Sequence, residues 1–151
     1  MNQQSSRKSP STDAHALAGE LRALAGKLKR RLREQADVGD LTPSQVSVLL
    51  RLEKDGPATA STLARMEGMR PQSMGSIITV LESAGLVRGS PHPTDGRQTI
   101  LSLTEACRTW IDKGRAARQD WLSRIIEARL SAEEQQQLAV AIGLLRRLVD
   151  D

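Results

Sequence analysis

The spacing of apolar residues, together with capping signals, predicts helices in six stretches of this chain. In the first stretch, leucines follow one another at steps of four, three, four and four, which places them on one stripe of a helix. A helix with such a stripe needs an apolar surface to pack against, so the pattern predicts a helix that joins an interface. The leucines of the stripe are Leu17, Leu21, Leu24, Leu28 and Leu32.

The second stretch, "LTPSQVSVLLRLEKDG", carries clear signals for both ends of a helix. Thr42 is placed as N-cap, Pro43 takes the first helical position, and Gln45 completes a capping box. Gly56-Pro57 ends the helix. "TASTLARMEG" then predicts a short helix that Thr59 caps and Gly68 stops.

The fourth helix is expected to begin with Arg70 at the cap position and Pro71 at the first helical position, and to end at Gly85. Two extended runs follow, over residues 86–90 and 97–103, and "PHPTDG" between them favours a tight hairpin turn. The order helix, helix, helix, hairpin predicts a mainly α fold with a small β-hairpin wing, which is a winged helix-turn-helix.

Two further helices are expected at the C-terminal end of the chain. Residues 104–130 place Cys107, Trp110 and Ile111 on an apolar stripe, which continues through Gly114, Trp121, Leu122 and Ile125. The last helix starts with the capping box Ser131 to Glu134. Its apolar stripe comprises Leu138, Ala141, Ile142, Leu145 and Leu148 or Val149.

The fourth helix has two contrasting faces. Its apolar face is predicted to be buried and comprises Met74, Ile77, Ile78 and Leu81. The opposite face carries Gln72, Ser76, Thr79 and Ser83, with Ser73 on its flank, and it lacks charge before Glu82. In a winged helix-turn-helix this helix enters the DNA major groove, where Gln pairs with adenine and Ser or Thr is permissive. The alternative is an ordinary solvated face.

The hairpin favours the DNA-binding hypothesis. Arg97 follows the Asp95-Gly96 turn and is placed to project from the wing tip into a minor groove or against a phosphate. Asp95 is expected to orient Arg97 or another arginine through a charged hydrogen bond. His92 could add a contact, although a single loop histidine is more often simply exposed.

Composition narrows the classes of function. The 151 residues carry a net charge of +4, and the basic excess lies in residues 1–36, with eight Lys and Arg against three Asp and Glu. No signal peptide or membrane span is expected, which predicts a cytoplasmic protein without membrane association. No catalytic constellation, metal site or cofactor motif is expected, because two histidines and a single cysteine are too few and too scattered.

The sequence resembles the MarR family of winged-helix regulators over about residues 13–151. The pieces that carry the resemblance are "LTPSQVSVLLRL", "TASTLARMEGMRPQSMGSIITVLESAGLV" and "PTDGRQTILSLTEAC", in this order. The resemblance implies a homodimer that binds the half-sites of a palindromic operator in double-stranded DNA. It implies a dimerisation helix at 13–36, the winged helix-turn-helix at 37–103 and dimerisation helices at 104–151. Residues 1–12 are polar and lack periodic apolar residues, which predicts a disordered tail.

The resemblance also implies roles for individual residues. Gln72, Ser73 and Ser76 would contact bases, Arg70 the helix entry and Arg97 the minor groove, while Asp95 would brace the wing; Thr79 belongs to the same DNA-facing set. The dimerisation residues would be Leu17, Leu21, Leu24, Leu28, Leu138, Ile142 and Leu145. The family usually has an arginine two residues after Gly-Leu-Val, whereas here Arg88 comes one residue early and Gly89 takes its place.

Two features could take part in regulation, Cys107 and the arginine pair Arg118 and Arg129, and each has two possible roles. Cys107 is either a thiol that senses oxidants, as in some members of the family, or an inert core residue, and its place on the apolar stripe favours the inert role. Arg118 and Arg129 either line an anion pocket, where the family often binds aromatic carboxylates or phenols, or pair with carboxylates across an interface.

Three hypotheses for function remain. The first is a dimeric transcriptional regulator, a repressor that a small aromatic or phenolic effector or an oxidant relieves. The second is a winged-helix protein-interaction module without DNA binding, which the nearly neutral central segment keeps open. The third, a small enzyme, has the least support because the chain lacks a cluster of catalytic groups.

Overall fold

The computed structural model describes residues 13–151, so the predicted tail at 1–12 lies outside the described residues. The chain divides into two compact units. The central unit comprises residues 36–120, and the terminal unit comprises the described residues up to 35 together with residues 121–151. One long helix, α5, contributes its first part to the central unit and its last part to the terminal unit.

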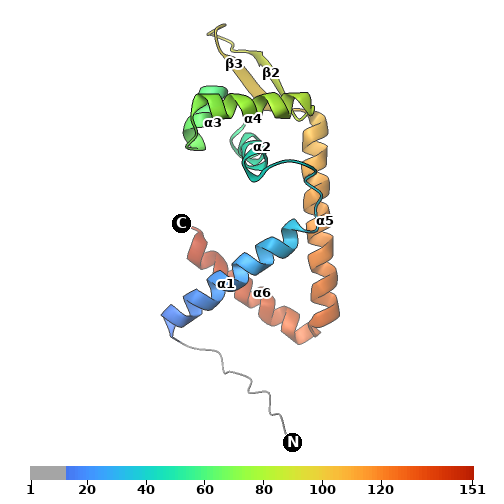
Figure 1. The fold of residues 1–151 in the computed structure, drawn as a ribbon. Helices are drawn as coiled ribbons and strands as arrows, with labels where there is room; N and C mark the ends of the chain where they lie inside the picture. Colours follow the sequence, from blue (N-terminus) through green and yellow to red (C-terminus); the bar gives the residue numbers. More distant parts are fainter. Residues whose placement is uncertain (1–12) are drawn as a thin grey trace, which may run out of the picture. The chain divides into compact units, whose positions relative to one another are not determined.

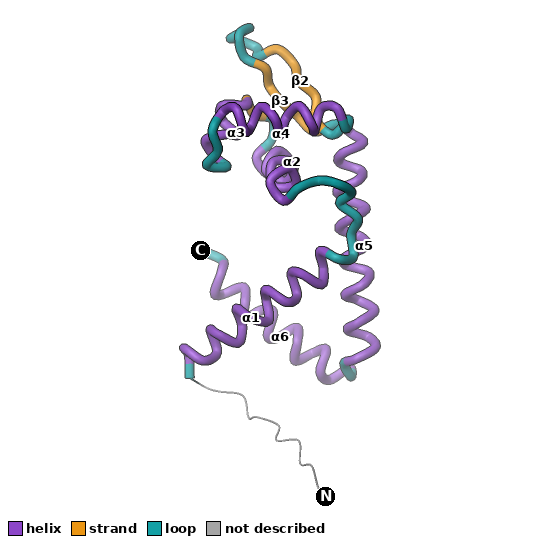
Figure 2. The backbone as a smooth tube through the Cα atoms, viewed as in Figure 1, coloured by secondary structure: helices purple, strands orange, loops and turns teal. Residues whose placement is uncertain are grey.

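The structure is mainly helical with a small antiparallel sheet, as the sequence predicts (Figures 1 and 2). The elements are α1 (Ala14–Arg33), α2 (Pro43–Asp55), β1 (Ala58–Thr59), α3 (Ala60–Met66), α4 (Pro71–Ser83), β2 (Val87–Pro91), β3 (Thr99–Leu103), α5 (Glu105–Arg129) and α6 (Ala132–Val149). The short strand β1 was not predicted. It pairs with β3 and gives the sheet the order β1-β3-β2. None of the described helices has the length and apolarity needed to cross a membrane.

The predicted helix ends are confirmed by their hydrogen bonds. Thr42 and Gln45 form a complete capping box at the start of α2, and Ser131 and Glu134 form another at the start of α6. The Thr59 side chain caps α3. Gly85 follows α4 with a positive φ of 73°, which the absence of a side chain makes inexpensive.

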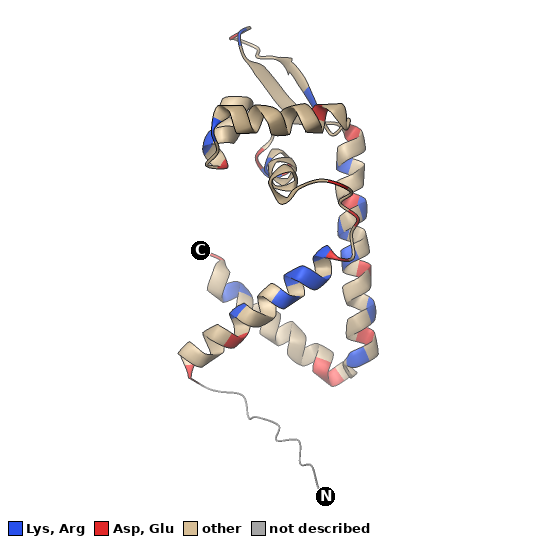
Figure 3. Ribbon diagram, in the orientation of Figure 1, with Lys and Arg blue, Asp and Glu red and all other residues tan. Residues whose placement is uncertain are grey.

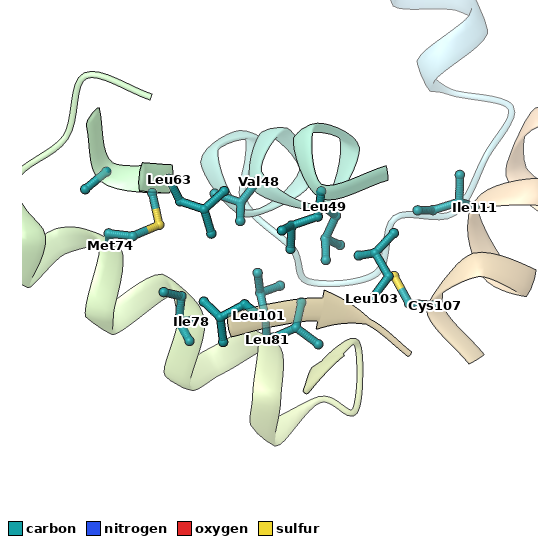
Figure 4. Packing of buried hydrophobic residues seen from close by; sticks show 13 residues of the cluster. Val48, Leu49, Leu63, Met74, Ile78, Leu81, Leu101, Leu103, Cys107 and Ile111 are labelled. Carbon is teal, nitrogen blue, oxygen red and sulfur yellow. The ribbon is translucent and has the colours of Figure 1, made fainter. Parts of the chain in front are cut away.

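The core of the central unit forms around the apolar face of α4. Met74, Ile78 and Leu81 are buried there, and Ile77 packs against the same cluster from a half-buried position. Figure 4 shows Met74, Ile78 and Leu81 pointing toward Val48 and Leu49 of α2 and toward the sheet. The cluster is completed by Leu52, Leu63, Ala64, Val87, Leu101, Leu103, Cys107 and Ile111. The predicted division of α4 into two faces is therefore confirmed on its buried side.

The described part of the terminal unit has no comparable core. Among the described residues, neither α1 nor α6 contains a buried side chain. The predicted dimerisation residues are exposed, except that Leu138 is half-buried. Leu24 is 63% exposed, and the other exposed members are Leu17, Leu21, Leu28, Ile142 and Leu145. The leucine stripe of α1 thus keeps much of its apolar surface open to solvent within one chain.

The hairpin brings Gly89 close to the side chain of Thr99. Gly89 pairs with Leu101, so it shares a sheet face with Thr99 and Leu103, whereas Arg88 pairs with Ser102 on the opposite face. A methyl group added at Gly89 would lie 2.7 Å from Cγ2 of Thr99. The place where the family usually has an arginine therefore has no room for a side chain here, and Arg88 points away from it.

We predict that Gly89→Ala lowers the free energy of unfolding by about 1 to 3 kcal/mol, because the new methyl group overpacks against a β-branched side chain with few rotamers. Urea unfolding of Gly89→Ala in the wild-type and Thr99→Ser backgrounds measures the effect. Serine lacks Cγ2, so most of the loss should disappear in the second background. An equal loss in both backgrounds would contradict the proposed clash.

Candidate nucleic-acid interface

The outward face of α4 presents short, uncharged polar side chains to solvent. Gln72, Ser73, Ser76 and Thr79 are all exposed. In Figure 3 the ribbon of α4 is almost entirely tan, the colour of residues other than Lys, Arg, Asp and Glu. The structure therefore brings these four predicted contact residues together on one exposed helix that is anchored through its other face.

The hydroxyl groups on this face have defined orientations. The Oγ of Ser76 donates to the carbonyl oxygen of Gln72 at 3.2 Å, and the Oγ1 of Thr79 donates to the carbonyl oxygen of Gly75 at 3.0 Å. Because each hydroxyl proton points back into the helix, these side chains offer acceptor lone pairs to a partner. The Gln72 side chain makes no hydrogen bond within the described part of the chain and keeps both its donor and its acceptor available.

The N-terminus of α4 is open to an anion. Arg70 occupies the N-cap as predicted, but its side chain makes no capping hydrogen bond. Pro71 at the first position has no N–H, so the backbone N–H groups of Gln72 and Ser73 are the donors left at this end. Free N–H groups at a helix N-terminus attract phosphate, and the exposed Arg70 adds a positive charge beside them.

A hydrogen-bonded cluster fixes the turn that precedes α4. Glu67 is the C-cap residue of α3, and its side chain is only 10% exposed. Its carboxylate accepts from Nε of Arg51 at 2.6 Å and from Oγ of Ser47 at 3.0 Å, which ties α2 to the end of α3. Gly68 follows with a positive φ of 63° and starts the turn. We call Ser47, Arg51 and Glu67 the turn clamp.

The sequence pattern did not indicate the turn clamp. Arg51 and Glu67 are 16 residues apart, and each looks like an ordinary charged surface residue of its helix. The ion pair raises the pKa of the Arg51 guanidinium, mainly through the hydrogen bond with Glu67. Arg51 also lies 3.5 Å from the Asp55 carboxylate, a longer contact one helical turn away.

The wing tip differs from the predicted tight hairpin. The strands end at Pro91 and begin again at Thr99, and Gly96 does not adopt a positive φ, so a type I′ turn at Asp95-Gly96 does not form. The imidazole of His92 holds the loop instead. Its Nδ1 accepts from the backbone N–H groups of Thr94 and Asp95, both at 3.1 Å. This half-buried histidine therefore organises the wing tip, a role that its sequence position did not suggest.

Asp95 braces the wing in a different way from the one predicted. Its carboxylate accepts from the backbone N–H of Arg97 at 3.1 Å, and within the described residues it forms no ion pair with an arginine. The correction has a simple cause: two residues apart in a turn, a short carboxylate reaches the backbone more easily than a guanidinium. The Arg97 side chain is exposed, and Figure 3 shows both charge signs at the wing tip.

Cys107 lies in the core of the central unit. Its side chain is fully buried, and burial raises the pKa of its thiol, with a further contribution from the negative charge of Glu53. A raised pKa reduces the thiolate that oxidants attack, so the geometry favours the inert role.

The two arginines considered for an anion pocket are placed differently. Arg129 lines a cavity of about 310 Å³ in the terminal unit, whereas Arg118 does not line it. The guanidinium of Arg31 lies over the ring of Trp121 in the same cavity, 5.6 Å from the ring centroid. The remaining lining residues are Leu24, Lys27, Leu28 and Ile125.

We predict that Glu67→Gln lowers the free energy of unfolding by about 1 kcal/mol, a value discounted for the partial exposure of Arg51. Urea unfolding measures the loss. The matched control is Asp55→Asn, which removes the longer contact to the same arginine and should cost less than half as much. Equal losses for the two variants would show that the turn clamp contributes nothing beyond a surface ion pair.

The sequence is similar to those of known helix-turn-helix regulators, as the fold and the exposed face of α4 lead one to expect. The model of the MarR family matches residues 41–99. An uncharacterized HTH-type transcriptional regulator of Mycobacterium bovis is 36% identical over 89% of this chain and 94% of its own length. The HTH-type transcriptional repressor MdtR of Bacillus subtilis is 28% identical over 79% of this chain and 76% of its own length.

Solved structures of transcriptional regulators have a similar fold. The crystal structure of a candidate transcriptional regulator from Pseudomonas aeruginosa has a TM-score of 0.77 and 34% identity, covering 93% of this chain and 99% of that one. A transcriptional regulator of Thermotoga maritima has a TM-score of 0.79 at 20% identity, covering 90% of this chain and 95% of that one, and supports the fold. On sequence and structure together, the chain belongs to the MarR family of helix-turn-helix transcriptional regulators.

Proposed function

We propose that the protein acts as a homodimeric repressor that binds a palindromic operator in double-stranded DNA and is released by a small effector. The observation that carries the proposal is the outward face of α4, where an uncharged polar surface adjoins an open helix N-terminus. The relative from Bacillus subtilis that is named a repressor supports repression as the direction of control.

In the proposed complex, α4 lies in the major groove. Gln72 pairs with an adenine edge, because its amide has both a donor and an acceptor free. Ser73 lies beside it at the groove. Ser76 and Thr79 accept hydrogen bonds from the exocyclic amino groups of adenine or cytosine, since their own protons are held by backbone carbonyls.

Phosphate contacts would orient α4 in the groove. The first phosphate contact is at the N-terminus of α4, from the backbone N–H groups of Gln72 and Ser73 and from the Arg70 guanidinium. The second is at the wing, where Arg97 extends into the minor groove or contacts its phosphates, on a loop that Asp95 and His92 hold in shape.

The terminal unit supports a dimer. Its helices α1 and α6 bury no side chain within one chain, yet both carry apolar stripes. Leaving this area in water costs roughly 25 cal/mol for each Å², so a second copy that covers it gains a large stabilisation. Obligate dimers commonly bury more than about 2,000 Å², which interleaved helices of this length can supply.

The cavity of the terminal unit supports an aromatic or phenolic effector. Three basic residues, Lys27, Arg31 and Arg129, surround apolar walls and the Trp121 ring. An aromatic carboxylate or a phenolate matches both features, because its ring packs on the walls while its anion meets the guanidinium groups. We assign no oxidant sensing to Cys107, since its thiol is buried.

We predict that Gln72→Ala weakens binding to the operator about tenfold, the loss expected for one good base contact. Binding to unrelated duplex should stay nearly unchanged, because it depends on phosphate contacts. Arg97→Ala should weaken binding to both duplexes and reduce the slope of log K against log salt by about 1. Titration of duplexes from upstream of the protein's own gene and of unrelated duplexes, across a salt series, measures each of these effects.

The control variant is Gln119→Ala, which removes an exposed glutamine of the same size from α5 and should leave both affinities unchanged. Size-exclusion chromatography with light scattering shows whether each variant keeps its oligomeric state. Absence of binding to any duplex at low salt would contradict the proposal and favour the alternative, a winged-helix protein-interaction module.

A further inference from the structure

A second cavity, in the central unit, has the opposite charge to the one in the terminal unit. Its volume is about 450 Å³, within the range of pockets that hold small organic ligands. The walls come from the linker before α2, Gln45 of α2, the C-terminal end of α4, the residues after it, and α5. The main lining residues are Asp37, Asp40, Leu41, Val80, Leu86 and Trp110.

The apolar part of this cavity is packed against the core on one side and exposed to solvent on the other. Leu41, Leu86 and Trp110 are half-buried and pack against the core cluster, so they form a fixed floor. Val80 is 45% exposed, although the opposite face of its helix lies in the core. An apolar ligand that covers Val80 and the Trp110 ring would remove this surface from water.

The charged part of the cavity is entirely negative. Asp37 and Asp40 are exposed at the linker, and none of the described residues that line the cavity is Lys, Arg or His. Asp37 Oδ1 accepts from the backbone N–H of Gly39 at 2.7 Å, which leaves its second oxygen for another partner. Two carboxylates alone would attract any small cation; the apolar floor and the indole ring restrict the choice to a cation with an apolar body.

We propose that this cavity binds a hydrophobic organic cation, such as a quaternary ammonium or phosphonium compound or a protonated aromatic amine. The apolar groups of the ligand lie on Leu41, Val80 and Leu86, and its positive charge lies between the carboxylates and the face of Trp110. Cation–π attraction and charge pairing both favour this placement, and both would oppose an anion of the same shape.

We expect a ligand in this cavity to change the affinity for DNA as well, and this expectation rests on the proposed function. Val80 and Ala84 belong to the C-terminal end of α4 and to its cap, so the ligand contacts the helix whose other end faces the groove. If the C-terminal end of α4 takes more than one position, a ligand that binds one of them more tightly raises the share of molecules in that position. The structure thus assigns the central unit an effector of opposite charge to the one expected in the terminal unit.

Two ions of the same shape and opposite charge provide the test: tetraphenylphosphonium and tetraphenylborate. The chain has only two tryptophans, so full-length Trp121→Phe protein reports the cavity through Trp110 fluorescence alone. Tetraphenylphosphonium should change this fluorescence saturably, and tetraphenylborate should not. An equal response to the two ions, or none to the cation, would overturn the proposal.

Charge removal provides the second arm. Asp37→Asn with Asp40→Asn keeps the shape of the linker, because asparagine can still accept from the Gly39 N–H, and should weaken the cation about fivefold. The control, Asp120→Asn with Asp150→Asn, makes the same change in net charge outside the cavity and should leave the affinity unchanged. Equal weakening in both pairs would mean nonspecific attraction and would contradict a site.

The DNA-linked step is tested separately with wild-type protein. Saturating tetraphenylphosphonium should lower the affinity for the operator at least threefold, and the Asp37→Asn, Asp40→Asn protein should need a higher concentration for the same effect. Cation binding with unchanged operator affinity would overturn the link to α4. Failure of the protein to bind DNA without the cation would count against the proposed function, and the fluorescence result would still decide the site.

Discussion

In the described part of the terminal unit, the apolar stripes of α1 and α6 are largely exposed to solvent. All fully buried apolar side chains of the described residues lie in the central unit, whereas α1 and α6 contain none. Two amphipathic helices without a core need a surface that covers them, because most helical stability in proteins comes from packing of the amphipathic face and not from helix propensity. A second copy of the chain is the simplest partner. The proposed dimer, and with it the two-fold symmetry of the operator, depends on this constraint.

The central unit holds the polar face of α4 toward solvent. Met74, Ile78 and Leu81 fix the rotation of α4 about its own axis, and the turn clamp fixes the point where α4 begins. Because the rotation and the starting point of α4 are fixed, the Gln72 and Ser76 side chains point in a defined direction. Little further entropy is lost when they contact a partner. Preorganisation of this kind raises affinity because less motion is lost on binding.

The sequence allowed prediction of features that depend on local chemistry or on periodicity. The capping boxes at Thr42 and Ser131 need only neighbours three residues apart, and the apolar face of α4 follows from helical spacing. The features that the sequence did not predict depend on contacts between distant segments or on loop geometry. The two-residue strand β1 exists only because β3 passes beside it, and the turn clamp joins residues from two helices.

The wing tip illustrates the same limit at shorter range. Asp95-Gly96 is a strong signal for a two-residue turn, yet the His92 imidazole satisfies the backbone N–H groups of Thr94 and Asp95 and favours a wider loop. The steric conflict at Gly89 depends on which residue lies across the hairpin, which the register fixes and the composition does not. The DNA contacts of the outward face of α4 and the roles of the dimerisation residues remain predictions about function.

Selection of bound sequences from a random duplex pool by the full-length protein tests the central claim most directly. A two-fold dimer with one α4 in each half-site predicts enrichment of an inverted repeat whose half-site centres lie about 10 base pairs apart, or a multiple of that spacing. Gln72 predicts an adenine at a fixed place in each half-site. Failure to enrich any sequence, or enrichment of a single asymmetric site, would contradict the account.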